Sequence, residues 1–121
     1  MNLIIHLLAG VLLALILALT FNNFRSKKEI SKWSKVEIES AEKIPEQLKE
    51  NPFVGKQLRY PFLREKRIKE KRVYYLIYED LKLVLVVAAS GKKDQQVTID
   101  HIISQFDEYR KVAEQIAKQV S

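Results

Sequence analysis

The spacing of apolar residues divides the chain into segments of different character. Residues 3–24 are an apolar run without a charged side chain, and in residues 27–50 apolar positions recur every three or four residues. Between residues 58 and 89 apolar and polar positions alternate or the apolar run is continuous, and after residue 94 the helical spacing returns. A period near 3.6 predicts an amphipathic helix and a period of two predicts a strand. The expected order is an apolar segment, helices, antiparallel strands and a final helix.

The first amphipathic segment, residues 27–50, predicts two short helices or one kinked helix, because Pro45 begins a helix better than it continues one. Residues 35–39 also fit a short strand, since Val36 and Ile38 alternate with charged residues. Asn51 before Pro52 disfavours the helical conformation and ends this segment.

Three strands are expected at residues 58–69, 72–79 and 81–89. Pro61 lacks a backbone donor, so the first strand should be split or lie at a sheet edge. The last strand has almost no alternation, which indicates burial on both faces at the centre of the sheet. Asp94 is expected to cap one final helix, whose apolar residues are Ile99, Ile102, Ile103, Phe106, Tyr109, Ala113, Ile116 and Val120.

The apolar run at the N-terminus predicts a hydrophobic helix at residues 1–24, ahead of one domain at residues 25–121. A helix over residues 3–24 rises about 1.5 Å per residue and is long enough for a hydrocarbon core of about 30 Å, so a membrane anchor is expected. The basic flank of Arg25, Lys27 and Lys28 would place the domain in the cytoplasm. The alternative is a hydrophobic helix buried within the domain or in an oligomer.

Composition removes several kinds of chemistry. The 121 residues contain no cysteine and two histidines, which excludes disulfides and thiol catalysis and leaves no expected metal or cofactor. The formal net charge of +6 favours an anionic partner such as nucleic acid, anionic lipid or an acidic protein.

Residues 64–72 carry six basic side chains and lead directly into a strand rich in tyrosine. If Lys69 and Glu70 form the turn, Arg67 faces Arg72, and such a like-charged pair is favourable only with an anion between its members. Cations that follow phosphates, beside rings that stack on bases, are typical of an RNA-binding sheet. The alternative is a solvated edge strand with its tyrosines in the core. The expected RNA-binding residues are Arg59, Lys66, Lys69, Lys71, Lys92 and Tyr74.

An ordered set of short motifs resembles the RelE/ParE superfamily of toxins from type II toxin-antitoxin systems. The set comprises Asn51-Pro52, Gly55-Lys56-Gln57-Leu58, the basic residues 64–68, Arg72-Val73-Tyr74-Tyr75, the apolar residues 81–89 and Gly91-Lys92-Lys93. The resemblance implies an α+β fold in which N-terminal helices pack on a small twisted antiparallel sheet, here with an added C-terminal amphipathic helix. It also implies binding to RNA or the ribosome, a cognate antitoxin, and in RelE-like members cleavage of mRNA.

The resemblance further implies four catalytic residues, Arg64, Arg67, Arg72 and Lys93, which would stabilise charge during attack by a ribose 2′-hydroxyl on the adjacent phosphate. The chain departs from the family where Ile99 stands in the region of an expected tyrosine and where Lys93 replaces an arginine. Two alternatives therefore stay open. One is a catalytically inactive RelE-fold binding module, and the other is a membrane-tethered interaction protein, held through residues 3–24, that uses its basic sheet face.

Overall fold

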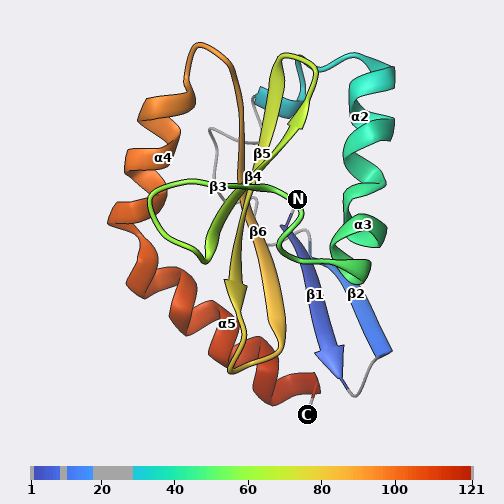
Figure 1. Cartoon of the computed structure of the whole chain (residues 1–121), viewed down its shortest axis with the longest axis vertical. Helices are drawn as coiled ribbons and strands as arrows, with labels where there is room; N and C mark the ends of the chain where they lie inside the picture. Colours follow the sequence, from blue (N-terminus) through green and yellow to red (C-terminus); the bar gives the residue numbers. More distant parts are fainter. Residues whose placement is uncertain (1, 9–10, 18–28, 121) are drawn as a thin grey trace.

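The structure, a computed structural model, describes residues 2–8, 11–17 and 29–120. The described chain has an α+β fold built on an antiparallel sheet with the strand order β2-β1-β6-β5-β4-β3 (Figure 1). The strands are β1 (Asn2–Leu8), β2 (Val11–Leu17), β3 (Lys56–Gln57), β4 (Leu63–Ile68), β5 (Lys71–Tyr78) and β6 (Leu83–Gly91). The helices are α2 (Lys35–Glu42), α3 (Ile44–Glu50), α4 (Gln95–Ser104) and α5 (Phe106–Val120).

Helices cover both faces of the sheet, so the molecule has three layers (Figure 1). On one face Ile44 and Leu48 of α3, with Trp33, pack on alternate residues of β5 and β6. On the other face α4 and α5 contribute Ile99, Ile102, Ala113 and Ile116 to a second cluster of buried residues. Because β5 and β6 are buried on both faces, their side chains are apolar almost without interruption.

The central position expected for the last strand is confirmed. β6 lies between β5 and β1, and all of its residues except Gly91 are buried. The break expected at Pro61 is confirmed as well, because the predicted strand 58–69 is regular only from Leu63, where β4 begins, and β4 lies next to one edge of the sheet.

The β4–β5 hairpin has the turn that the sequence predicts. Arg67 pairs with Arg72 and Ile68 with Lys71, which leaves Lys69 and Glu70 as the turn. Lys69 has φ 55° and Lys82, in the connection to β6, has φ 52°. Both lysines adopt the left-handed conformation, which costs an L-residue about 1–2 kcal/mol.

The hydrophobic helix predicted at residues 1–24 is wrong for residues 2–8 and 11–17, and the rest of that range lies outside the described residues. Residues 2–8 and 11–17 instead form β1 and β2, which pair with each other, and β1 also pairs with β6 through Ile4 and Leu85. An apolar run without alternation fits a buried helix or a strand covered on both faces, and periodicity cannot separate the two. Within the part of the chain that the structure describes, no helix combines the length and apolar character needed to cross a membrane. The basic flank at residues 25–28 lies outside the described residues.

Two other expectations about helices need correction. Residues 35–39 belong to α2 and not to a strand, because Ser34 and Glu37 form a reciprocal capping box at its start. The expected final helix is divided into α4 and α5 at Gln105, whose N–H bonds the carbonyl of Ile102 as in a tighter turn. The first helical segment is likewise divided, and Pro45 stands in the first turn of α3.

A strap formed by residues 51–62 crosses the edge of the sheet and contains β3; it is green in Figure 1. Tyr75 anchors it, because its hydroxyl accepts a hydrogen bond from the N–H of Gly55 at 2.9 Å and donates one to the carbonyl of Pro52 at 2.8 Å. Burial raises the pKa of Tyr75, so the hydroxyl keeps its proton for this contact. A methyl group on Gly55 would lie 2.6 Å from that hydroxyl oxygen.

The first prediction concerns this close approach. Gly55→Ala should lower the free energy of unfolding by about 1–3 kcal/mol, because the added methyl group has no room beside Tyr75. Gly91→Ala is the matched control, since its added methyl group would meet nothing closer than a Glu29 oxygen at 3.8 Å. Urea unfolding of both variants measures the difference, and equal stability would contradict the anchoring role of Tyr75.

Candidate nucleic-acid interface

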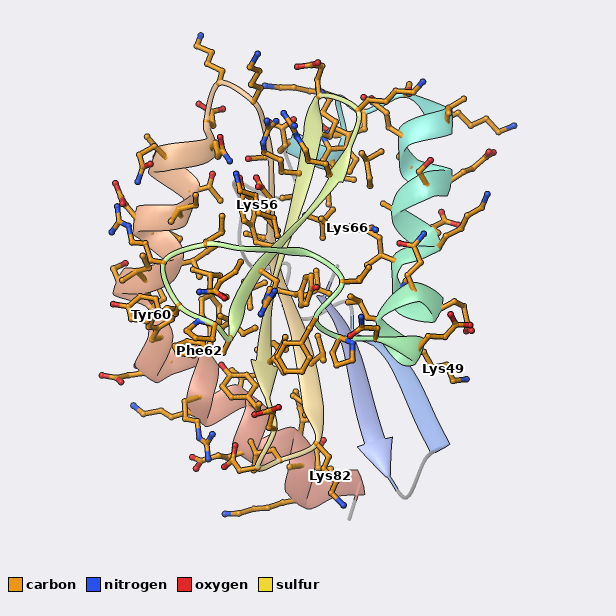
Figure 2. All side chains as sticks on the ribbon, viewed as in Figure 1. Lys49, Lys56, Tyr60, Phe62, Lys66 and Lys82 are labelled. Atoms are coloured by element: carbon orange, nitrogen blue, oxygen red, sulfur yellow. The ribbon has the colours of Figure 1, made fainter. Side chains whose placement is uncertain are left out.

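The edge of the sheet formed by β4, the strap and the following turn carries a line of cations, which we call the basic edge. Its members are exposed or half-buried: Lys56, Arg59, Arg64, Lys66, Arg67 and Lys69. Alternation along β4 directs Arg64 and Lys66 to the face covered by α2 and α3, and Arg67 to the opposite face. Because only the two-residue β3 lies beyond β4, cations on both faces remain accessible at this edge. Figure 2 shows Lys56 and Lys66 there.

The sequence predicts an anion beside the facing Arg67 and Arg72, and Glu65 of β4 supplies one to Arg72. The Arg72 Nε atom lies 3.0 Å from Glu65 Oε1, and the two side chains are 4% and 2% exposed. Gln95 at the start of α4 donates to the same Glu65 oxygen at 2.8 Å, and Arg72 donates to the carbonyl of Glu70 at 2.9 Å. Arg72 is therefore buried and neutralised, which corrects the expectation of an accessible catalytic guanidinium.

Tyr74 is also buried, with 0% of its surface exposed. Its hydroxyl shares a hydrogen bond of 2.7 Å with the Ser90 hydroxyl, and burial raises its pKa to about 12. A ring enclosed in this way cannot stack on a base, so the assignment of Tyr74 to RNA binding is wrong. The tyrosines of β5 belong to the core, as the alternative interpretation held.

Arg64 is half-buried and held in one orientation. Its Nε donates to the carbonyl of Pro61 at 2.9 Å, its Nη1 donates to that of Gly55 at 3.1 Å, and its guanidinium lies 5.2 Å from the centre of the Phe53 ring. These partners carry no formal charge. Arg64 therefore fastens the strap to β4 without a carboxylate that would neutralise its guanidinium.

Exposed aromatic side chains of the strap lie beside the basic edge, and these were not among the expected site residues. The rings of Tyr60, Phe62 and Phe106 are each 5.3 Å from one another, and Tyr60 and Phe62 are 39% and 37% exposed. The sequence signal is the stretch RYPFLR, in which two aromatic residues lie between two arginines. Pro61 prevents regular pairing in this stretch, and the rings consequently stay near the surface.

The remaining predicted cations gather at the end of the β4–β5 hairpin. Lys71 is opposite Gly91, and the exposed Lys92 and Lys93 follow Gly91 directly. Lys71 approaches Glu29 at 3.8 Å. At the other end of the edge, Arg59 forms an exposed ion pair with Asp100 at 3.2 Å, a kind of contact that contributes little to stability.

The four predicted catalytic residues do not converge on one point. Arg64 and Arg67 project from opposite faces of β4 and are separated by about 10 Å along the strand. Arg72 is enclosed by its ion pair, and Lys93 stands in the loop after β6. Among the described residues no group of His, Asp and Glu side chains is arranged to hold a metal ion.

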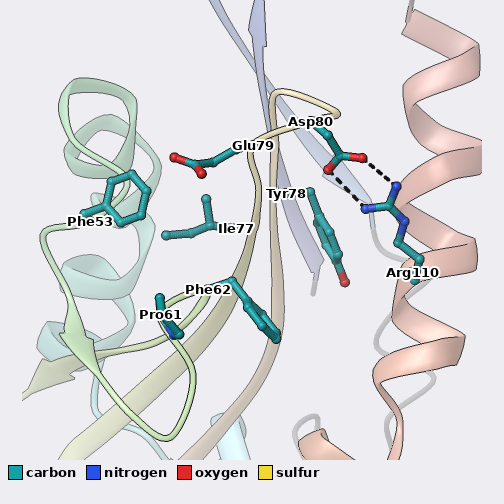
Figure 3. A pocket seen from close by; sticks show the side chains of 8 residues that line it. All are labelled: Phe53, Pro61, Phe62, Ile77, Tyr78, Glu79, Asp80 and Arg110. Atoms are coloured by element: carbon teal, nitrogen blue, oxygen red, sulfur yellow. Dashed lines mark hydrogen bonds and ion pairs between the residues drawn. The ribbon is translucent and has the colours of Figure 1, made fainter.

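A surface hollow of about 510 Å³ adjoins the basic edge where β5 extends past the start of β4 (Figure 3). Phe53, whose ring contacts Arg64, and Phe62, which stacks on Tyr60, both line it. The other lining residues are Pro61, Ile77, Tyr78, Glu79, Asp80 and Arg110.

Comparison with family models, with curated proteins and with solved structures finds no match to this chain. The described residues define an α+β protein with a basic edge and adjoining exposed aromatic rings.

The second prediction tests whether Arg72 has a structural role. Arg72→Met or Glu65→Leu alone should each cost about 3–5 kcal/mol of folding free energy, because each leaves a buried charge without its partner. The double variant should recover most of that loss. The exposed pair Asp80 and Arg110 is the control, and Asp80→Asn should cost about 1 kcal/mol or less. Urea unfolding that shows Arg72→Met as stable as the wild type would contradict the buried ion pair.

The third prediction concerns alkaline pH. The pKa of Tyr74 is about 12 in the folded chain and about 10 in an unfolded one. The stability that comes from this difference is complete below pH 10 and is lost as the pH rises to 12. The wild type should therefore lose about 2–3 kcal/mol more stability over this interval than Tyr74→Phe. Parallel pH dependences of the two unfolding free energies would show that the Tyr74 hydroxyl is not buried.

Proposed function

We propose that this chain is a RelE/ParE-like RNA-binding protein that holds single-stranded RNA, free or on the ribosome, along its basic edge. The observation that carries the proposal is a set of cations without a carboxylate partner among the described residues, next to exposed rings. Lys56, Arg64, Lys66 and Arg67 make up this set, and Lys69, which also interacts with the Glu37 carboxylate, follows them at the turn.

The arrangement suits a single strand. Lysine and arginine bind phosphates, and release of counterions from the nucleic acid then favours association. Tyr60 and Phe62 can stack on bases, an interaction worth about 1–3 kcal/mol per base that does not depend on sequence. Cations placed along one strand of a sheet follow a single phosphate backbone better than they cover a planar lipid surface, which favours RNA over anionic headgroups.

Binding is better supported than cleavage. A ribonuclease of the proposed kind needs its cations around one phosphate, whereas Arg64 and Arg67 lie on opposite faces of β4 and Arg72 is neutralised by Glu65. His101 is exposed on α4, and Tyr74 is enclosed in the core. Of the functions that the family resemblance implies, we therefore prefer a catalytically inactive binding module.

The fourth prediction is a salt-dependent affinity for RNA. An unstructured RNA of about 12 nucleotides should bind with an affinity that falls as salt rises, by a slope of roughly −0.7 per phosphate contacted. Lys66→Ala with Arg67→Ala should weaken binding about tenfold or more and reduce the slope by about 1.4. The matched control, Lys111→Ala with Lys118→Ala, removes equal charge from α5 and should bind like the wild type. Fluorescence anisotropy measures all three proteins.

Two results would contradict the proposal. If both double variants weakened RNA binding equally, binding would depend on the net charge of the protein and not on the basic edge. Site-specific cuts in mRNA in a translating extract, abolished by Arg67→Ala, would show instead that the chain is a ribonuclease.

A further inference from the structure

The hollow beside the basic edge combines an apolar floor, aromatic walls and one free carboxylate. Ile77, which is 5% exposed, forms the floor, and Phe53 and Phe62 stand on either side of it (Figure 3). Glu79 and Pro61 lie at opposite ends. The volume of about 510 Å³ is within the usual range of about 300–1,000 Å³ for small-ligand sites.

The two carboxylates at the rim differ in their availability. Asp80 accepts two hydrogen bonds from Arg110, at 3.1 and 2.6 Å, and these hold the pKa of its carboxyl below the usual range. Glu79 is exposed, and its side chain has no hydrogen bond or ion pair within the described part of the chain. Its backbone carbonyl accepts from Lys82, which fixes the position of the residue at the end of β5.

We propose that the hollow binds the guanine base of a single-stranded RNA, with the ring next to Phe53 and Phe62 and the Glu79 carboxylate accepting hydrogen bonds from guanine N1–H and N2–H. An ionised carboxylate only accepts, and it offers two oxygens side by side. Guanine alone among the four common bases presents two adjacent donors on its Watson–Crick edge, so Glu79 complements guanine and meets an acceptor on the others.

The hollow is continuous with the basic edge, and this continuity indicates a nucleic-acid ligand. Arg64 contacts the Phe53 wall and Tyr60 stacks on Phe62, so a base in the hollow would have a cation and a further ring beside its neighbouring nucleotides. The same cations disfavour the main rival occupant, an arginine-bearing peptide, because they would repel it. The inference rests on the proposed function, since it names the base that the RNA-binding surface would select.

The fifth prediction tests the hollow with three oligonucleotides of equal length: all-adenine, the same with one central guanine, and the same with inosine, which lacks the 2-amino group. The guanine form should bind the wild type about tenfold more tightly than the all-adenine form, and inosine should lie between them. Glu79→Gln should abolish the preference, because a neutral amide no longer offers two acceptors to guanine N1–H and N2–H. Glu42→Gln, which changes an exposed carboxylate of α2, is the matched control and should keep the preference.

Titration with guanosine, followed by amide chemical shifts, separates the two proposals because it does not need the basic edge. Equal binding of the three oligonucleotides, or a preference that survives Glu79→Gln, would overturn the guanine site and leave RNA binding intact. Guanosine shifts around Ile77 without any oligonucleotide binding would support the site and overturn the proposed function. Shifts caused by an arginine-containing peptide and not by guanosine would overturn the site and assign the hollow to a protein partner.

Discussion

The ion pair between Glu65 and Arg72 determines which charges of the β4–β5 hairpin reach the surface. Arg67 and Arg72 are directly opposite each other, an arrangement that is unfavourable without a neighbouring anion. Glu65, two residues before Arg67 on the same face of β4, supplies that anion and also bonds Gln95 at the start of α4. The hairpin can thus pack under a helix on this face while Arg67 stays accessible.

The second structural requirement is the strap. Tyr75 and Arg64, a cross-strand pair of β5 and β4, hold it through backbone atoms of Pro52, Gly55 and Pro61. This anchoring positions exposed rings and cations beside the same edge. The proposed RNA-binding surface therefore arises from contacts whose first role is to fix a loop.

Much of the fold follows from the sequence, because strand breaks and turns have local causes. Pro61 separates β3 from β4, the continuous apolar run marks β6 as central, and the Lys69–Glu70 turn sets the pairing of Arg67 with Arg72. The apolar run at the N-terminus has no local signal of this kind. Its assignment to β1 and β2 depends on the free edge of β6, which is a tertiary property.

The site was harder to predict than the fold because the charge or aromatic ring of a residue does not indicate whether its side chain is buried. Arg72 and Arg67 look alike in the sequence, but Arg72 is buried on the inner strand β5, where Glu65 pairs with it, and Arg67 is exposed on β4 next to the sheet edge. Tyr74 lies in a strand that helices cover, whereas Tyr60 and Phe62 lie in a loop that they leave partly open. The accessible rings thus come from the segment around Pro61, where the strand pattern was weakest.

The most direct test of the RNA-binding edge is a map of amide chemical-shift changes in the ¹⁵N-labelled full chain as an unstructured RNA is added. The account predicts that the changes gather on the strap, on β4 and at the Lys69 turn, and that the solvent-facing side of α5 stays unaffected. Changes that centre on α2 or α5, with the basic edge unmoved, would contradict it.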